Sequence, residues 1–146
     1  MNAMIGSKQG DRRVQALLND LELKYEIDSD GDFKVAFELE SGRSQVVFIR
    51  SETESLGKFE IREIFSVGYT SEGPLNADIA NALLIFNAHV KLGSWQVARQ
   101  HDDTCIAIFS AQIAANTDAQ SLFTTLAAVI QTADEVEKKL TNEDKF

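Results

Sequence analysis

The order in which hydrophobic periodicity changes along the chain limits its possible folds more than any other feature. Apolar residues repeat first at helical spacing, then at every second position over three or four segments, then at helical spacing again. A strand-like pair and a long last helical segment follow. A period of two indicates strands and a period near 3.6 indicates helices. The sequence therefore predicts a two-layer α+β fold of order α-β-β-β-(β)-α-β-β-α, with three helices on an antiparallel sheet of five or six strands.

The ends of the three expected helices carry recognisable signals. Asp11 precedes the first helix and is a suitable acceptor for the free N–H groups of a helix start. The second helix is expected to begin after Asn76 and to be closed by Gly93. A capping-box pattern that starts at Thr117 predicts the beginning of the third helix, whose apolar side continues to Leu140.

Two hairpins are predicted in the first third of the chain. Residues 23–40 alternate between apolar and polar side chains on both sides of Asp30-Gly31. Glycine tolerates the positive φ that a two-residue hairpin turn needs, so this dipeptide predicts a tight turn. Ser41-Gly42 predicts a second turn, which leads into a strand over residues 45–50.

The next strand has an irregular phase. Residues 51–58 predict a polar loop, and residues 59–69 predict a strand. Glu63 lies on the apolar face of that strand, whereas Ile64 lies on the opposite face. A β-bulge near Glu63 would resolve part of this conflict, and so would an Ile64 that faces a partner.

Two expected strands are apolar on both faces, at residues 46–49 and 105–109. A sheet that helices cover on one face only should alternate between apolar and polar residues. Central placement in the sheet with partial cover would explain some of this pattern, and a subunit interface would explain the rest, so we expect a homodimer. The candidate contact residues are Val47, Ile49, Ile64 and Ile106.

The 146-residue length suits one domain, expected over residues 11–140. Residues 1–10 are expected to form a flexible lead-in without an export signature, and residues 141–146 a frayed tail. The single cysteine excludes an internal disulfide and indicates a reducing compartment. The longest apolar run, residues 82–86, is too short to span a bilayer. We therefore expect a cytoplasmic protein.

The charge of the chain favours some classes of partner over others. Lysine and arginine number 14 and aspartate and glutamate number 23, which gives a net charge of −9. Such a surface repels phosphate backbones and anionic lipids, so neither nucleic acid nor a membrane is an expected partner. A charged partner should carry a basic or amphipathic segment.

Patterns that would indicate catalysis or metal binding are missing or incomplete. Residues 28–32 resemble the start of a calcium loop, but the sixth position is Phe33 and the twelfth is Leu39, where glycine and glutamate are required. Cys105 lies in an apolar strand, which favours a buried core thiol over a nucleophile. We therefore expect no catalytic residue, no cofactor and no metal.

Several local patterns carry a likeness to a known family. They are VQALL at residues 14–18, YEIDSDGDF at 25–33, FELESGRSQ at 37–45, ALLIFN at 82–87 and GSW at 93–95. With these patterns, and in the order of elements over residues 11–140, the chain resembles the YbjN-like family of bacterial proteins, described as sensory transduction regulators. The fold of that family is similar to that of type III secretion chaperones. The resemblance implies a non-enzymatic, chaperone-like or regulatory binding domain that is commonly dimeric.

Two functional hypotheses follow. The first is a protein-interaction module that holds a partner segment against a sheet face, a sheet edge or a helix groove. The second is a small-molecule-binding domain or enzyme, with a cleft between the sheet and the second helix lined by Trp95, Tyr69 and nearby carboxylates. An exposed apolar face would favour the first, and a deep pocket with convergent polar groups would favour the second.

Overall fold

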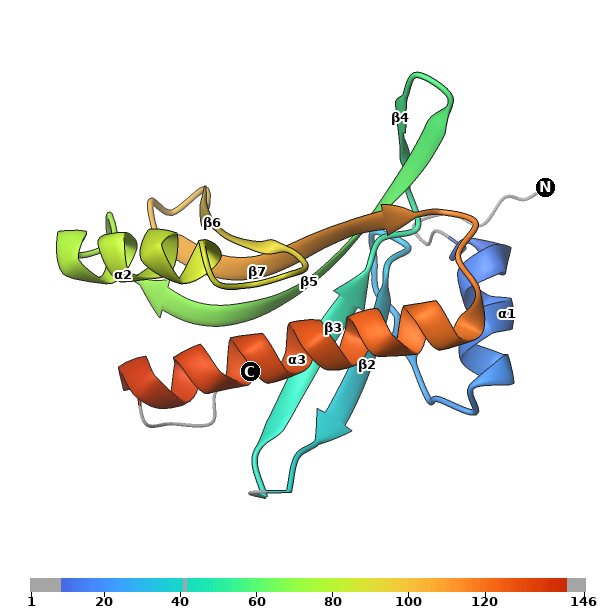
Figure 1. Ribbon diagram of the computed structural model, residues 1–146, viewed down its shortest axis with the longest axis horizontal. Helices are drawn as coiled ribbons and strands as arrows, with labels where there is room; N and C mark the ends of the chain where they lie inside the picture. The colour runs from blue at the N-terminus through green and yellow to red at the C-terminus, as the bar shows by residue number, and fades with distance from the viewer. Residues whose placement is uncertain (1–8, 41, 142–146) are drawn as a thin grey trace.

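The computed structural model describes residues 9–40 and 42–141 and has an α+β architecture (Figure 1). Its three helices are α1 (Arg12–Asp20), α2 (Ala77–Asn87) and α3 (Ala119–Thr141). Its strands are β1 (Glu26–Ile27), β2 (Phe33–Glu38), β3 (Ser44–Ile49), β4 (Glu54–Leu56), β5 (Phe59–Ser71), β6 (Ser94–Arg99) and β7 (Cys105–Ala114). The described residues thus confirm the predicted fold class but form seven strands, where five or six were expected.

All strand pairs in the described sheet are antiparallel, in the order β1-β2-β3-β5-β7-β6. The additional strand is β4, which pairs with β5 and lies in the segment predicted as a polar loop. Its three residues are all exposed, and Gly57 turns the chain with a φ of +60°. A short hairpin that is solvated on both sides needs no apolar alternation, so periodicity gave no signal for it.

The hydrophobic core lies between one face of the sheet and the helices, and we call this the inner face. Helix α3 lies across the sheet and packs against β3, β5 and β7, whereas α2 packs against β6 (Figure 1). All three helices contribute to one buried cluster. Its members include Val14, Leu18, Phe33, Val47, Ile49, Ile64, Leu83, Trp95, Phe109, Leu122, Leu126 and Val129. Burial of one such large side chain contributes roughly 1.5–3 kcal/mol, so these contacts dominate the stability of the fold.

The sheet opens between β3 and β5, where polar groups replace the strand ladder. The two strands pair only at Phe48–Phe65 and Ile49–Ile64. Beyond this point the fully buried Gln45 donates from Nε2 to Ser66 Oγ and to the carbonyl oxygen of Val67, both at 2.9 Å. A buried backbone carbonyl must find a donor, so the Gln45 side chain takes over from the missing strand neighbour.

Helix α3 is also tied to the end of the β2–β3 hairpin by ion pairs. Arg43 places Nε 2.8 Å from Asp134 Oδ1 and Nη2 2.6 Å from Glu137 Oε1. The Glu137 side chain is fully buried, so its charge needs this guanidinium close by. The pairs hold α3 to the β2–β3 half of the opened sheet, and its packing against β5 and β7 covers the other half.

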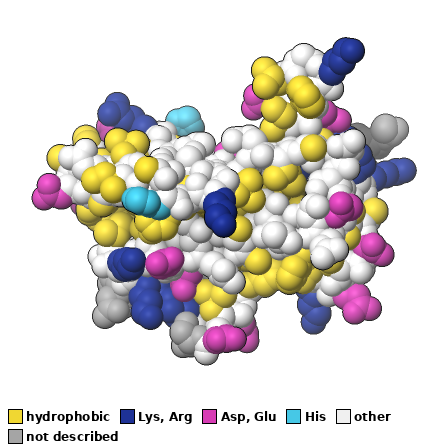
Figure 2. Space-filling view, viewed as in Figure 1, with side chains coloured by type: hydrophobic (Ala, Val, Ile, Leu, Met, Phe, Trp, Pro, Cys, Tyr) yellow, Lys and Arg dark blue, Asp and Glu magenta, His cyan; other side chains and the backbone are white. Residues whose placement is uncertain are grey.

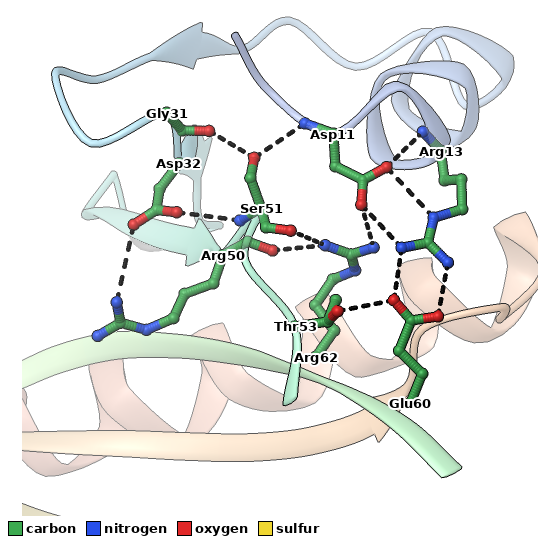
Figure 3. A network of polar contacts seen from close by, with 9 residues as sticks. All are labelled: Asp11, Arg13, Gly31, Asp32, Arg50, Ser51, Thr53, Glu60 and Arg62. Carbon is green, nitrogen blue, oxygen red and sulfur yellow. Dashed lines mark hydrogen bonds and ion pairs between the residues drawn. The ribbon is translucent and has the colours of Figure 1, made fainter. Parts of the chain in front are cut away.

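A second buried arginine anchors the start of α1 (Figure 3). Arg62 of β5 is only 2% exposed, and its Nη2 lies 2.8 Å from Asp11 Oδ2. Its Nη1 donates to the carbonyl oxygens of Arg50 and Ser51 at 2.7 and 2.9 Å. Asp11 also accepts the backbone N–H of Arg13 at 2.8 Å, which confirms it as the N-cap of α1. Burial opposes ionisation of Asp11, but hydrogen bonds from Arg13 and Arg62 outweigh it and hold its pKa well below the usual range.

The other predicted helix ends are only partly confirmed. Asn76 caps α2 by accepting the N–H of Asp78 at 2.8 Å. Gly93 does not close α2, which ends at Asn87; it turns the chain into β6 with a φ of +88°. Helix α3 begins one residue later than the capping box predicts, because Asp118 accepts the N–H of Ser121 at 2.7 Å.

The irregularity in β5 lies at Gly68, whereas the sequence placed a possible bulge near Glu63. Pairing with β7 shifts between Val67 and Tyr69, while Glu63 pairs regularly with Gln112. Glycine is required at this position because a Cβ atom there would lie 2.4 Å from Cη2 of Trp95. The expected lead-in and tail lie almost wholly outside the described residues.

Replacement of Asp11 by alanine should lower the free energy of unfolding by about 2–4 kcal/mol. The change removes a helix cap and leaves the buried Arg62 without its carboxylate. Urea denaturation at neutral pH measures the loss. Asp118→Ala is the matched control, because it removes only a cap and should cost about 1 kcal/mol. Equal losses for the two variants would contradict the role given to the ion pair.

The pH dependence of stability should report the ion pair in which Arg13 Nη2 lies 2.8 Å from Glu60 Oε2. Hydrogen bonds from Arg13 and Thr53 lower the pKa of Glu60 from 4.5 to about 2. A carboxylate with a depressed pKa stabilises the fold fully above its unfolded pKa, and this stabilisation is lost as the pH falls toward the folded value. Chemical denaturation between about pH 5 and about pH 2 should therefore show a smaller loss of stability for Glu60→Gln than for the unmodified protein. Parallel curves would contradict this assignment.

Candidate protein-binding surface

The sheet face that points away from the core carries a group of apolar side chains, and we call it the outer face. Strand pairing brings Phe48 beside Phe65 and Val67 beside Ile108 on this side. Helix residues in the core cluster all pack against the inner face, and no apolar residue of the outer face belongs to that cluster in the described chain. The outer face consists of Val46, Phe48, Phe65, Val67, Ile106 and Ile108.

An aromatic pair with an adjacent ion pair forms one end of the outer face. The rings of Phe48 and Phe65 stack with centroids 5.0 Å apart and planes at 13°. The guanidinium carbon of Arg50 lies 5.1 Å from the centroid of Phe65, a distance suited to a cation–π contact. Arg50 Nε is also 2.6 Å from Glu63 Oε1. These contacts hold the side chains in place, so little conformational freedom remains to be lost on binding.

Three of the four residues predicted to contact a partner lie elsewhere. Val47, Ile49 and Ile64 are fully buried on the inner face, beneath the helices. Ile106 alone lies on the outer face, where it pairs with Thr70 and Ala98. The prediction that residues 46–49 and 105–109 are apolar on both faces is correct, but Val47, Ile49 and Ile64 belong to the buried face of β3 and β5, where the chain's own helices cover them.

The composition of β5 explains why the sequence placed a candidate contact residue, Ile64, on the face that proves to be buried. Its inner face carries Arg62, Ser66 and Gly68 around Ile64. Its outer face carries Phe65 and Val67, so the solvent side is the more hydrophobic of the two. The polar inner residues are satisfied by long-range partners such as Asp11 and Val46, and a single sequence does not reveal those contacts.

Trp95, which the ligand-cleft hypothesis placed in a site, lies in the core. Its side chain is 5% exposed, and its ring meets Phe109 edge-on with centroids 5.4 Å apart. It also packs against Gly68, beside the carbonyl oxygen of Ala133 in α3. The indole therefore fills the space between the sheet and α3.

The acidic turn at residues 28–32 is built as a hairpin. The carboxylate oxygens of Asp28, Asp30 and Asp32 lie within 4.8 Å of one another. Asp28 Oδ1 accepts the N–H groups of Asp30 and Asp32 at 2.9 and 3.0 Å. Asp32 accepts the N–H of Ser51 at 3.0 Å, so two of the carboxylates hold the turn and its neighbouring loop together.

Ile64 and Val67 of β5 should respond differently to truncation, because their side chains lie on opposite faces of the sheet. Ile64→Ala should lower the free energy of unfolding by about 2–5 kcal/mol, since it leaves a cavity beneath α3. Val67→Ala should cost about 1 kcal/mol or less, because its side chain is only partly buried within the chain. Urea denaturation at low protein concentration measures both. A larger loss for Val67→Ala would show that the two faces are wrongly assigned.

The sequence matches no protein-family model and no curated protein. Among the residues that the structure describes, no helix combines the length and the hydrophobicity needed to cross a membrane.

Proposed function

We propose that this protein is a non-enzymatic protein-binding module of the YbjN-like type, with a chaperone-like or regulatory role in the cytoplasm. The observation that carries the proposal is the outer face, where apolar side chains of three strands lie on the side opposite the helices. Apolar side chains that gather on the side of a sheet left uncovered by helices mark candidate sites of protein association.

The chemistry of the outer face suits association and not bond making. Its six defining side chains are aliphatic or aromatic and carry no nucleophile, acid or base. Of the charged groups beside it, Arg50 and Glu63 are engaged with each other, and Lys34 lies opposite Phe48 on the neighbouring strand. A broad apolar surface with charges at its edge is also the usual composition of a protein–protein interface.

A second copy of the chain is the occupant that we propose for the outer face. In a two-fold symmetric contact the same patch is used twice, so each copy covers an apolar surface of the same size and shape. The ion pair at the edge offers both signs of charge to such a partner. The net charge of −9 opposes association, but charges far from the contact are screened over about 8 Å at physiological salt.

Sedimentation equilibrium tests this proposal. The unmodified protein should have twice the chain mass of 16.2 kDa, and Val67→Glu should restore the mass of one chain by placing a charge inside the contact. The matched control is Leu84→Glu, an equally severe change at a 65% exposed position on α2, which should stay dimeric. An unmodified protein with the mass of a single chain, or a dimeric Val67→Glu variant, would refute the self-contact.

A further inference from the structure

The hairpin of β4 and β5 projects from the body of the molecule and carries apolar side chains (Figures 1 and 2). Leu56 and Phe59 pair across it and are 66% and 71% exposed, more than any other large hydrophobic side chain in the described chain. We call this hairpin the arm. Two large apolar side chains at such positions add little to the stability of the chain itself, so their exposure calls for another explanation.

Two adjacent hollows lie at the base of the arm. The first, of about 380 Å³, is lined by Glu52, Glu54, Leu56, Ile61 and Glu63, among others. The second, of about 220 Å³, is lined mainly by apolar groups, including Leu56, Phe59, Ile61 and Ala114. Leu56 and Ile61 line both hollows, which places an acidic and an apolar subsite side by side.

The acidic subsite keeps an excess of negative charge. Arg50 also lines it, but this guanidinium is 2.6 Å from Glu63 and is therefore neutralised. Glu52 and Glu54 are exposed, and neither forms an ion pair within the described residues. Two carboxylates thus remain beside an apolar groove, which favours a cation carried on an apolar stem.

We propose that the base of the arm binds a segment of another protein in which a lysine or arginine lies next to an apolar side chain. The cation sits between Glu52 and Glu54, its methylene stem lies over Ile61, and the neighbouring apolar side chain enters the groove beside Leu56 and Phe59. This inference rests on the proposed function as a protein-binding module, but it uses a surface different from the outer-face residues that contact a second copy. The net charge of −9 attracts the same class of partner over longer distances.

Fluorescence anisotropy with a defined probe tests the inference. The probe is a short fluorescein-labelled peptide in which leucine and lysine alternate. Peptides with glutamate in place of lysine, or serine in place of leucine, should bind much more weakly, because each removes one half of the recognised pattern. Affinity for the leucine–lysine peptide should also fall as salt is added, since the carboxylates are exposed.

Variants of the protein locate the binding site. Glu52→Gln with Glu54→Gln should weaken binding about tenfold, and Phe59→Ser should have a similar effect. The matched control is Asp20→Asn with Glu72→Gln, which changes the net charge equally at exposed positions away from the arm and should leave the affinity unchanged. Sedimentation of each variant should give the same mass as the unmodified protein.

Equal affinities of the two double variants would overturn the inference, because binding would then follow net charge alone. A dimer that Phe59→Ser converts to single chains would also overturn it, by assigning the arm to a self-contact. Failure of the outer-face contact is a separate result. In that case Val67→Glu leaves the sedimentation mass unchanged, while the peptide affinities still decide the role of the arm.

Discussion

The packing of α3 against the inner face is the contact on which the rest of the structure depends. Strand side chains alternate between faces with a period of two, so burial of one residue forces its neighbours to the opposite side. Once Ile64 lies beneath α3, Phe65 must lie on the outer face, where it stacks on Phe48. The presence of apolar side chains on the outer face is therefore a direct geometric consequence of how the core is filled.

Buried polar groups on the inner face hold this arrangement in one register. Arg62 binds Asp11 and two backbone carbonyls, and Arg43 binds Asp134 and Glu137. Such pairs are costly to desolvate and add little net stability compared with apolar packing, but an unmatched partner would be strongly unfavourable. Any slip of β5 by one residue would expose Arg62 and bury Phe65, so the charged contacts select against the alternative register.

The two proposed binding surfaces lie along the same strand. The outer side of β5 carries Phe59 and Ile61 on the arm and Phe65 and Val67 over the body of the sheet. Glu63 and its ion pair with Arg50 separate the two apolar stretches. A single long strand can therefore present one surface to a second copy of the chain and another to a basic segment of a partner.

Local patterns in the sequence determined the fold class, the order of the principal elements, the Asp30-Gly31 turn and the caps at Asp11 and Asn76. These features depend on residues within a few positions of one another, so periodicity and capping chemistry are enough to find them. Strand β4, the bulge at Gly68 and the identity of the solvent face were decided only by the tertiary structure. Strand β4 is solvated on both sides and so leaves no apolar alternation in the sequence. The other two features depend on contacts between distant residues: Gly68 with Trp95, Arg62 with Asp11, and Ile64 with the helix that covers it. When both faces of a strand are apolar, alternation alone does not predict which face a helix will cover. That face is determined by packing between residues that are far apart in the sequence.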